Sequence, residues 1–282
     1  MIETDAIRTI EKAFLNALEQ WREGKRESSF FIITGWPGLG KSTLLHHLEG
    51  ICAREKCQSH YIDLDKRQRK NARYWQRVYP ASLRNIQNRS LCLFFDHVPP
   101  ITDTALRGID KQIIREHREQ AFMVFALIDR EQWGLTTPQI GRRVSLAPFT
   151  PAEIAALLSE DRSRLTEETF DELRKLGHPD LALNIARKGR KAGCESFLDH
   201  WLERVEEKAL QGVLYSPGIS RLAEEYAEVS ETAIQEVWLN PSEIIGALRR
   251  AGWIGWPLNG KEGSPDLWVP PVRYCLRVLG SR

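Results

Sequence analysis

The stretch from residue 29 to residue 48 constrains the fold of this chain more than any other. It reads Ser-Phe-Phe-Ile-Ile-Thr-Gly-Trp-Pro-Gly-Leu-Gly-Lys-Ser-Thr-Leu-Leu-His-His-Leu. Phe30–Thr34 is an apolar, β-prone run of the kind found in buried parallel strands. Leu44, Leu45 and Leu48 then recur at helical spacing. The sequence therefore predicts a strand, a glycine-rich turn and a helix in direct succession.

The turn matches the G-x-x-x-x-G-K-S pattern of a phosphate-binding loop. Its glycines allow backbone N–H groups to curl around an anion, and the helix that follows directs the positive end of its dipole to the same place. The Lys41 ammonium suits β- and γ-phosphates, and the Ser42 hydroxyl suits Mg²⁺. We expect a nucleotide to bind through Gly35, Pro37, Gly38, Leu39, Gly40, Lys41, Ser42 and Thr43.

Composition indicates a globular chain with two or three domains. It has 282 residues, 42% of them hydrophobic, and a mean hydropathy of −0.40. We expect a cytoplasmic protein, because no apolar run approaches the roughly 20 residues of a membrane span and no signal peptide is visible. The five cysteines are scattered and are expected to be reduced thiols without a metal. The net charge of +2 gives no overall signal for nucleic acid.

A second informative stretch, Leu91–Asp96, is an apolar run that ends in an acid and resembles the Walker B strand of nucleotidases. A carboxylate at the end of such a strand can hold the shell of Mg²⁺, usually through water. Ser42 and Asp96 are therefore the expected metal ligands. His97 follows, and a neutral imidazole can in principle serve as a base.

Further strands and helices alternate along the chain. The pattern predicts a short strand at 61–65, a helix at 104–119, a buried strand at 122–128 and a shorter strand at 144–147. Such alternation favours a parallel α/β sheet with its ligand at the carboxyl ends of the strands. Arg130 would lie at that edge, where it could sense a γ-phosphate or equally form a surface ion pair.

The remainder of the chain is predicted to be mainly helical. Thr150-Pro-Ala-Glu153 has the pattern of a capping box at the start of a helix. Three short helices and a hairpin pattern near the C-terminus indicate a winged helix, with Trp238, Trp253, Trp256 and Trp268 expected in its core. The predicted domains are an α/β core at 1–149, a helical lid at 150–205 and a winged helix at 206–282.

Charge gives little support for nucleic-acid binding. The most basic run, Lys66–Arg73, is followed by two aromatic residues and could contact nucleic acid, although a solvated surface is the simpler interpretation. Residues 210–282 hold seven basic residues (Arg221, Arg249, Arg250, Lys261, Arg273, Arg277, Arg282) and eight acidic ones (Glu224, Glu225, Glu228, Glu231, Glu236, Glu243, Glu262, Asp266). A duplex-binding domain normally carries a clear basic excess.

Taken in order, these parts resemble the STAND class of signalling ATPases, the NACHT and NB-ARC type relatives of AAA+ proteins. Gly35–Leu45 is similar to the phosphate loop of that class, and Gly177-His178-Pro179 to its GxP motif. Leu146–Ile154 resembles its transition from sensor strand to lid, and Arg130 matches its sensor arginine. The resemblance implies that Pro179 packs on adenine. It also implies that ATP or ADP with Mg²⁺ controls conformation, self-association or engagement of a separate effector or sensor protein.

Departures from that class narrow the expectation. His97 stands where a second acid usually activates water, and the winged-helix segment has no histidine to contact an ADP phosphate. We therefore expect a weakly hydrolysing ATPase whose catalytic candidates are Lys41, Asp96, His97 and Arg130. Two alternatives remain open. One is a DNA-binding AAA+ ATPase of initiator or transposition-regulator type, and the other is a nucleotide-stabilised scaffold without turnover.

Overall fold

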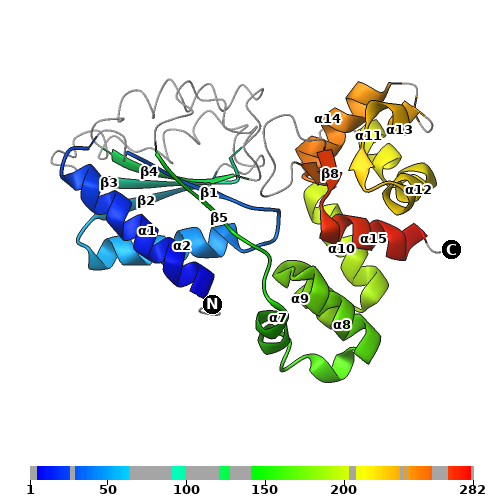
Figure 1. Cartoon of the computed structure of the whole chain (residues 1–282), viewed down its shortest axis with the longest axis horizontal. Coiled ribbons are helices and arrows are strands. Elements are labelled where there is room, and N and C mark those ends of the chain that lie inside the picture. Colours follow the sequence, from blue (N-terminus) through cyan, green and yellow to red (C-terminus); the bar gives the residue numbers. More distant parts are fainter. Residues whose placement is uncertain are drawn as a thin grey trace. The chain divides into compact units, whose positions relative to one another are not determined.

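A computed structural model describes residues 5–25, 29–63, 91–98, 121–127, 141–202, 208–235, 238, 240–255 and 266–280 (Figure 1). The chain divides into two compact units. The first, here called the α/β unit, contains residues 3–35 and 40–146, and the second, the helical unit, contains residues 36–39 and 147–282. Several predictions lie outside the described residues: the basic run at 66–73, the helix at 104–119, Arg130 and the hairpin turn at 256–265. Among the described residues, no helix is long and apolar enough to cross a membrane.

A five-stranded parallel sheet forms the centre of the α/β unit, in the order β2-β3-β4-β1-β5. The strands are β1 (Phe30–Thr34), β2 (Gln58–Asp63), β3 (Leu91–Asp96), β4 (Ala121–Leu127) and β5 (Arg142–Ser145). Phe31 of β1 lies opposite Val124 of β4, which lies opposite Phe94 of β3. This register aligns the carboxyl ends of the strands at one edge of the sheet, so the predicted parallel α/β core is confirmed.

Two strands begin earlier in the chain than the sequence pattern predicts. β2 starts at Gln58 instead of Tyr61, and β5 covers Arg142–Ser145 instead of residues 144–147. Most side chains of β5 are exposed, and its only partner among the described strands is β1. An edge strand of this kind tolerates charged side chains. The strand begins with two arginines, so hydrophobic periodicity does not reveal where it starts.

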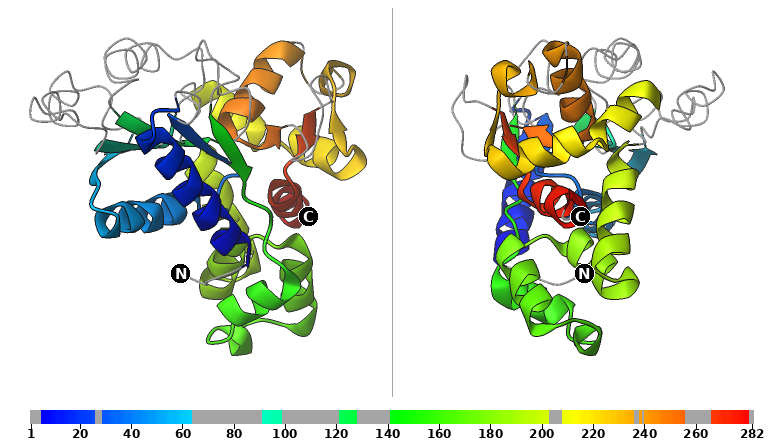
Figure 2. Two further views of the ribbon diagram at one scale, coloured as in Figure 1. Left: turned by 60° about the vertical axis from the view of Figure 1, so that its left-hand side comes forward. Right: turned by 90° about the vertical axis from the view of Figure 1, so that its right-hand side faces the viewer.

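Two helices, α1 (Asp5–Arg22) and α2 (Lys41–Arg54), lie on the same face of the sheet (Figure 2). An apolar stripe of α1 faces the sheet, because its members Ile7, Ile10, Phe14, Leu18 and Trp21 are all buried. The ring of Phe14 meets those of Phe31 and Phe122 edge to face, with centroids 5.4 and 5.7 Å apart. Such pairs favour one packing arrangement beyond simple burial of area.

The helical unit consists mainly of short helices. Its helices are α7 (Pro151–Leu157), η4 (Arg162–Arg164), α8 (Glu167–Leu176), α9 (Pro179–Lys188), α10 (Arg190–Leu202), α11 (Lys208–Leu214), α12 (Pro217–Glu225), α13 (Glu231–Gln235), α14 (Pro241–Ala251) and α15 (Pro270–Gly280). Thr150 caps α7 in a full capping box with Glu153, as predicted. An antiparallel sheet in the order β6-β8-β7 contains Glu228–Val229, Asp266–Trp268 and Ile254–Gly255.

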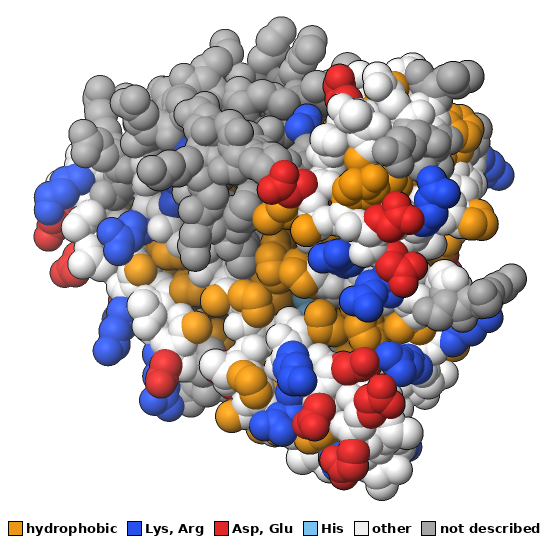
Figure 3. Space-filling view, turned by 45° about the vertical axis from the view of Figure 1, so that its right-hand side comes forward, with side chains coloured by type: hydrophobic (Ala, Val, Ile, Leu, Met, Phe, Trp, Pro, Cys, Tyr) orange, Lys and Arg blue, Asp and Glu red, His pale blue; other side chains and the backbone are white. Residues whose placement is uncertain are grey.

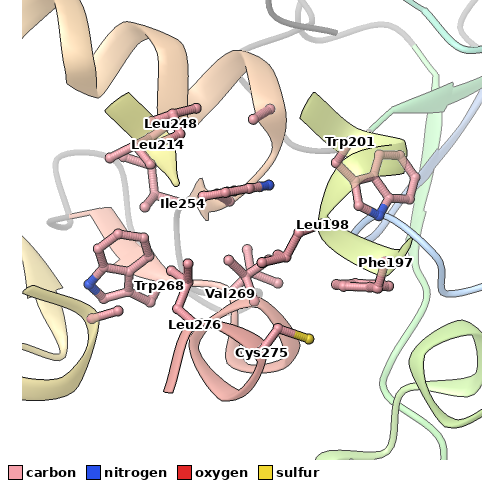
Figure 4. Packing of buried hydrophobic residues seen from close by; sticks show 14 of the residues in the cluster. Phe197, Leu198, Trp201, Leu214, Leu248, Ile254, Trp268, Val269, Cys275 and Leu276 are labelled. Atoms are coloured by element: carbon pink, nitrogen blue, oxygen red, sulfur yellow. The ribbon is translucent and has the colours of Figure 1, made fainter. Parts of the chain in front are cut away.

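One hydrophobic cluster runs through the helical unit from Ile154 to Leu276. Figure 4 shows Leu198 of α10 near Val269, which directly precedes α15, and Cys275, which lies in the middle of that helix. The cluster includes Trp253 and Trp268, as predicted. The prediction for Trp238 is wrong, because its side chain is 39% exposed. Trp238 donates its backbone N–H to the carbonyl of Ile234 at 2.8 Å, but its side chain remains at the surface, unlike those of Ala233 and Ile234.

Candidate functional site

The phosphate-binding loop connects the end of β1 to the first residue of α2. Gly38 and Gly40 have φ angles of 78° and 89°, a left-handed backbone region that glycine adopts without strain. The Lys41 ammonium donates to the carbonyl of Gly35 at 2.6 Å, so its side chain folds back over the loop. Gly40 caps α2 without a side chain, and the first turn of α2 holds no acid. A helix start of this composition suits an anion, which fits the predicted phosphate site.

The tip of the loop, Trp36–Leu39, is grouped with the helical unit. Nε2 of His178 donates to the carbonyl of Pro37 at 2.6 Å, while its Nδ1 accepts from the backbone N–H of Leu181 at 3.2 Å. Because Nδ1 is the acceptor, the proton of this neutral imidazole is on Nε2. His178 is only 1% exposed and caps α9, whose first residue, Pro179, is also buried. Helix α9 and the loop tip therefore share one buried hydrogen bond.

Gly38 also lies against the start of α9. A Cβ atom at this position would lie 2.5 Å from Cε1 of His178 and 3.0 Å from Cβ of Asp180. Only glycine therefore fits, for reasons of both φ and space. Burial raises the pKa of Asp180, whose carboxylate accepts from the side-chain amide of Asn184.

Asp96 occupies the end of β3, where the sequence places it. The residue is 3% exposed. Its carboxylate accepts hydrogen bonds from the Tyr61 hydroxyl and from the backbone N–H of His97, the latter at 2.8 Å. Burial and the neighbouring Asp96 carboxylate raise the pKa of Tyr61 well above its usual range. Tyr61 therefore remains a hydrogen-bond donor that orients Asp96.

His97 turns back toward the sheet. Its φ angle of 51° is in the left-handed region, and its Nδ1 lies 2.9 Å from Oδ1 of Asp63 and 3.7 Å from Oδ2 of Asp96. Asp63 ends β2 and is directly opposite Asp96 in the sheet register. The carboxyl ends of two neighbouring strands thus bring together two carboxylates and one imidazole.

This cluster suits a magnesium ion that is bound partly by protein and partly by phosphate and water, and not one bound by protein ligands alone. Among the described residues, no group of three or more His, Cys, Asp or Glu side chains is arranged to hold a metal ion. Mg²⁺ commonly takes only one or two carboxylates and completes its shell with phosphate oxygens and water. β4 separates β3 from β1, so the Asp96 strand lies roughly 10 Å from the loop strand. A hydrated ion and a phosphate could bridge this span.

Part of the candidate site is predictable from the sequence. The loop residues lie between β1 and α2, and Asp96 and His97 follow the apolar part of β3, whereas Arg130 lies outside the described residues. Asp63, Tyr61 and the loop contact of His178 were not predicted to be functional. The available signal was weak: residues 61–65 were predicted as a strand with acids at its end, but no motif connected them with Asp96.

No protein-family profile matches the sequence, and no curated protein matches it. Distant structural likenesses exist. The RuvB Holliday junction branch migration motor of Thermotoga maritima is 16% identical with a TM-score of 0.45, over 93% of this chain and 91% of that one. AMPPCP-bound DnaA from Aquifex aeolicus is 15% identical with a TM-score of 0.45, over 88% of both chains. PCH-2 of C. elegans is 10% identical with a TM-score of 0.42, over 71% and 64%. Likenesses at this level define neither a family nor a function for the chain.

Proposed function

We propose that the chain is an ATP-binding switch of the AAA+ type, with slow hydrolysis. The observation that carries this proposal is the buried hydrogen bond between His178 and the Pro37 carbonyl. It joins a helix of the helical unit to the tip of the loop that would hold the phosphates. A phosphate that changes the loop conformation would act directly on the start of α9.

The loop and the first turn of α2 would bind the phosphates of ATP. Lys41 would exchange its contact with the Gly35 carbonyl for one with the β- and γ-phosphates. Ser42 and Asp96 would contribute to the shell of Mg²⁺, which neutralises phosphate charge. Pro179, buried at the first position of α9, would pack on adenine, as the STAND resemblance implies.

Hydrolysis would depend on His97 and Asp63. The Asp63 carboxylate at Nδ1 of His97 favours the tautomer that carries its proton there. The other ring nitrogen, Nε2, would then accept a proton from an attacking water. Asp63 would thus orient a base in the place where the sequence lacks a second acid. We infer turnover that is slow but measurable, which distinguishes the switch from an inert scaffold.

More specifically, we propose that the chain is a switch of the STAND class. ATP and ADP would stabilise different arrangements at the loop tip, and the γ-phosphate would favour self-association or engagement of a separate effector or sensor protein. The energy for this shift would come from the difference between the affinities of the two states for ATP. The proposed site residues and the division of the helical unit near residue 205 belong to this hypothesis.

A second candidate function is a DNA-acting AAA+ ATPase of initiator or transposition-regulator type. One observation favours it: α12, β6, α13, α14, β7 and β8 follow one another as the helices and strands of a winged helix do, and the strands form one sheet. The charges of the helical unit favour it less. Figure 3 shows basic and acidic side chains intermixed in its lower part, and pairs such as Arg174 with Asp171 are ion-paired. DNA-acting modules commonly present a basic stripe instead.

The test compares the wild type with Lys41→Ala, using Lys191→Ala as a control because Lys191 is exposed on α10. We expect Lys41→Ala to weaken binding of Mg²⁺–ATP by at least about tenfold, since it removes a charged phosphate contact. Light scattering with ADP and with a non-hydrolysable ATP analogue measures the switch. Nucleotide affinity equal in all three proteins would disprove the site, and an unchanged monomer in both nucleotides would count against self-association.

The same samples separate the two candidate functions. Duplex DNA is added at several salt concentrations, and ATP hydrolysis is measured with and without it. Binding that weakens steeply with salt, together with stimulated hydrolysis, would favour the DNA-acting candidate. An ATP-dependent change of mass without DNA binding would favour the STAND-type switch.

A further inference from the structure

Three cysteines from different parts of the α/β unit meet in its interior. Cys52 lies in the last turns of α2, Cys57 immediately precedes β2, and Cys92 is the second residue of β3. They are 0%, 6% and 0% exposed, and they lie close enough for each to shift the pKa of the others. Cys92 is four residues before Asp96, roughly 13 Å along the strand. The cluster is therefore separate from the candidate nucleotide site.

The turn after α2 explains why Cys52 and Cys57 are neighbours. The N–H of Cys57 donates to the carbonyl of Cys52 at 2.9 Å, and that of Lys56 donates to Ala53 at 3.2 Å. Lys56 has a φ of 57°. Together these features form a Schellman motif, which reverses the chain and joins the backbones of Cys52 and Cys57 by its 6→1 hydrogen bond. A disulfide needs Cα atoms about 4.4–6.8 Å apart, so a backbone that brings the two cysteines together in this way favours one.

Arg22, the last residue of α1, makes Cys57 chemically different from the other two thiols. Its Nη2 lies 2.9 Å from Sγ of Cys57 and also donates to the carbonyl of Glu55. The neighbouring thiols of Cys52 and Cys92, followed by the Arg22 charge, lower the pKa of Cys57. The proximity of Cys57 raises the pKa of Cys52. Of these thiols, Cys57 therefore ionises most readily, and the thiolate is the nucleophilic form of cysteine.

We propose that Cys57 and Cys52 form a thiol oxidation site for a small hydroperoxide such as hydrogen peroxide. The Cys57 thiolate attacks one peroxide oxygen, which forms an S–O bond, breaks the O–O bond and releases hydroxide. Cys52, as its thiolate, then attacks the Cys57 sulfur, forming the S–S bond and displacing the second hydroxide. Protons from the two thiols convert both hydroxides to water, so two thiols and one peroxide give one disulfide and two waters.

The surroundings favour a small oxidant over a large one. The side chain of Arg22, whose Nη2 contacts the Cys57 sulfur, is 37% exposed. Cys57 itself is 6% exposed, so we expect a small oxidant to reach its sulfur more readily than a protein disulfide does. Cys92 lies within β3 and is 0% exposed, so we expect it to stay reduced.

A second pair of cysteines provides an internal control. Cys194 of α10 and Cys275 of α15 are also buried, and they lie close enough for Cys194 to shift the pKa of Cys275. Burial, followed by the neighbouring thiol of Cys194, raises the pKa of Cys275. This pair tests whether proximity and burial alone produce oxidation. We expect both thiols to stay reduced under conditions that oxidise Cys57.

The experiment treats the folded, full-length chain with a few equivalents of hydrogen peroxide, followed by alkylation and peptide mapping by mass spectrometry. The five free thiols should fall to three, with a Cys52–Cys57 disulfide that dithiothreitol reverses. Cys52→Ser should leave a sulfenic acid at Cys57 that dimedone traps. Arg22→Gln should slow oxidation by at least about tenfold at neutral pH, because the thiolate loses its cation.

Two results would overturn the proposal: oxidation of Cys57 no faster than that of Cys194, or reaction only after denaturant unfolds the chain. The comparison with Cys194 uses the wild type alone, so it holds even if a substitution prevents folding. The thermal unfolding midpoint of each variant shows whether it has folded. Cys92→Ser should still form the disulfide, and its failure to do so in a folded chain would instead place Cys92 in the reacting pair.

Discussion

His97 contacts acids at the ends of two neighbouring strands. Its Nδ1 is 2.9 Å from the Asp63 carboxylate, and its backbone N–H donates to Asp96. A residue with a φ of 51° is uncommon outside glycine, and strain of this kind is kept where the surroundings impose it. Here the left-handed turn is what brings the imidazole back toward β2. We infer that this orientation, and not the residue type alone, makes His97 a candidate base.

Substitutions at this pair test that role. Asp63→Asn and His97→Ala should each lower kcat for ATP hydrolysis by about 100-fold or more, because a general base typically contributes about 10²–10⁴-fold. KM for ATP should change little. Since Asp63 acts through His97, adding Asp63→Asn to His97→Ala should cause no further loss. Asp171→Asn, at an exposed acid of α8, is the control. If the two effects multiply in the double variant, Asp63 acts independently of His97, for example on Mg²⁺.

The buried acid Asp180 has a pH-dependent effect on stability. Burial raises its pKa, so the folded chain binds its proton more tightly than the unfolded chain does. The resulting stability is fully present below the unfolded pKa of about 3.9 and is lost as pH rises through the folded pKa. Asp180→Asn should therefore unfold at a higher temperature than the wild type at pH 7, and the difference should shrink to near zero at about pH 4. Thermal unfolding followed by circular dichroism measures it. An Asp180→Asn variant that is less stable than the wild type at pH 7 would contradict the sign.

Residues whose chemistry is encoded in consecutive positions could be predicted from the sequence. The phosphate loop and the pair Asp96–His97 are such motifs. Asp63 and Tyr61 were missed as site residues because their role depends on the register of β2 against β3. The contact of His178 with Pro37 spans 141 positions in the chain, and no local pattern encodes it. Side chains that act through space in this way require the fold itself.

At the scale of elements, the start of α9 and the phosphate loop form one contact surface. Gly38 and Gly40 share the same backbone class, with φ angles of 78° and 89°. They differ in the room available for a side chain. A Cβ at Gly38 would clash with His178 and Asp180, whereas no atom lies within 4 Å of a Cβ at Gly40. Substitutions at the two glycines can therefore distinguish the cost of backbone strain from the cost of a clash with α9.

Alanine at each glycine should reveal this difference. Gly40→Ala should cost about 1–3 kcal/mol of unfolding free energy for its φ angle alone. Gly38→Ala should cost about 1–3 kcal/mol more, since the added methyl forces His178 or the loop to move. Chemical denaturation without nucleotide measures both. His178→Ala combined with Gly38→Ala should recover part of the extra cost. Equal losses for the two single variants would show that α9 does not bear on the loop.

Elements were predictable wherever apolar periodicity is strong, and less so elsewhere. α1, α2, β1, β3 and β4 follow this rule. The two-residue strand β6 was missed because it is too short to show alternation, and it is held by pairing with β8. Helix α15 was missed because its first two residues are prolines, a pattern that also suits a turn.

At the scale of the whole chain, the predicted lid and winged helix fall within one compact unit. A polar triad connects their helices. Arg190, at the start of α10, donates to Glu172 of α8 at 2.8 Å and to the hydroxyl of Tyr274 of α15 at 3.0 Å. That hydroxyl in turn donates to Glu172 at 3.0 Å. The ends of the helical unit, distant in sequence, therefore share the same hydrogen bonds.

This triad predicts that α8 and α15 open together. In native-state hydrogen exchange, amides of the two helices should show the same opening free energy in the wild type, because one cooperative unit protects both. Tyr274→Phe removes two hydrogen bonds and should lower the opening free energy of α15 by about 1 kcal/mol relative to α8. Tyr215→Phe is the matched control, since its hydroxyl bonds to Asp199 and not to α8. Different opening free energies for α8 and α15 in the wild type would show that the lid and the C-terminal helices move separately. A nucleotide signal passed through His178 would then end at the lid.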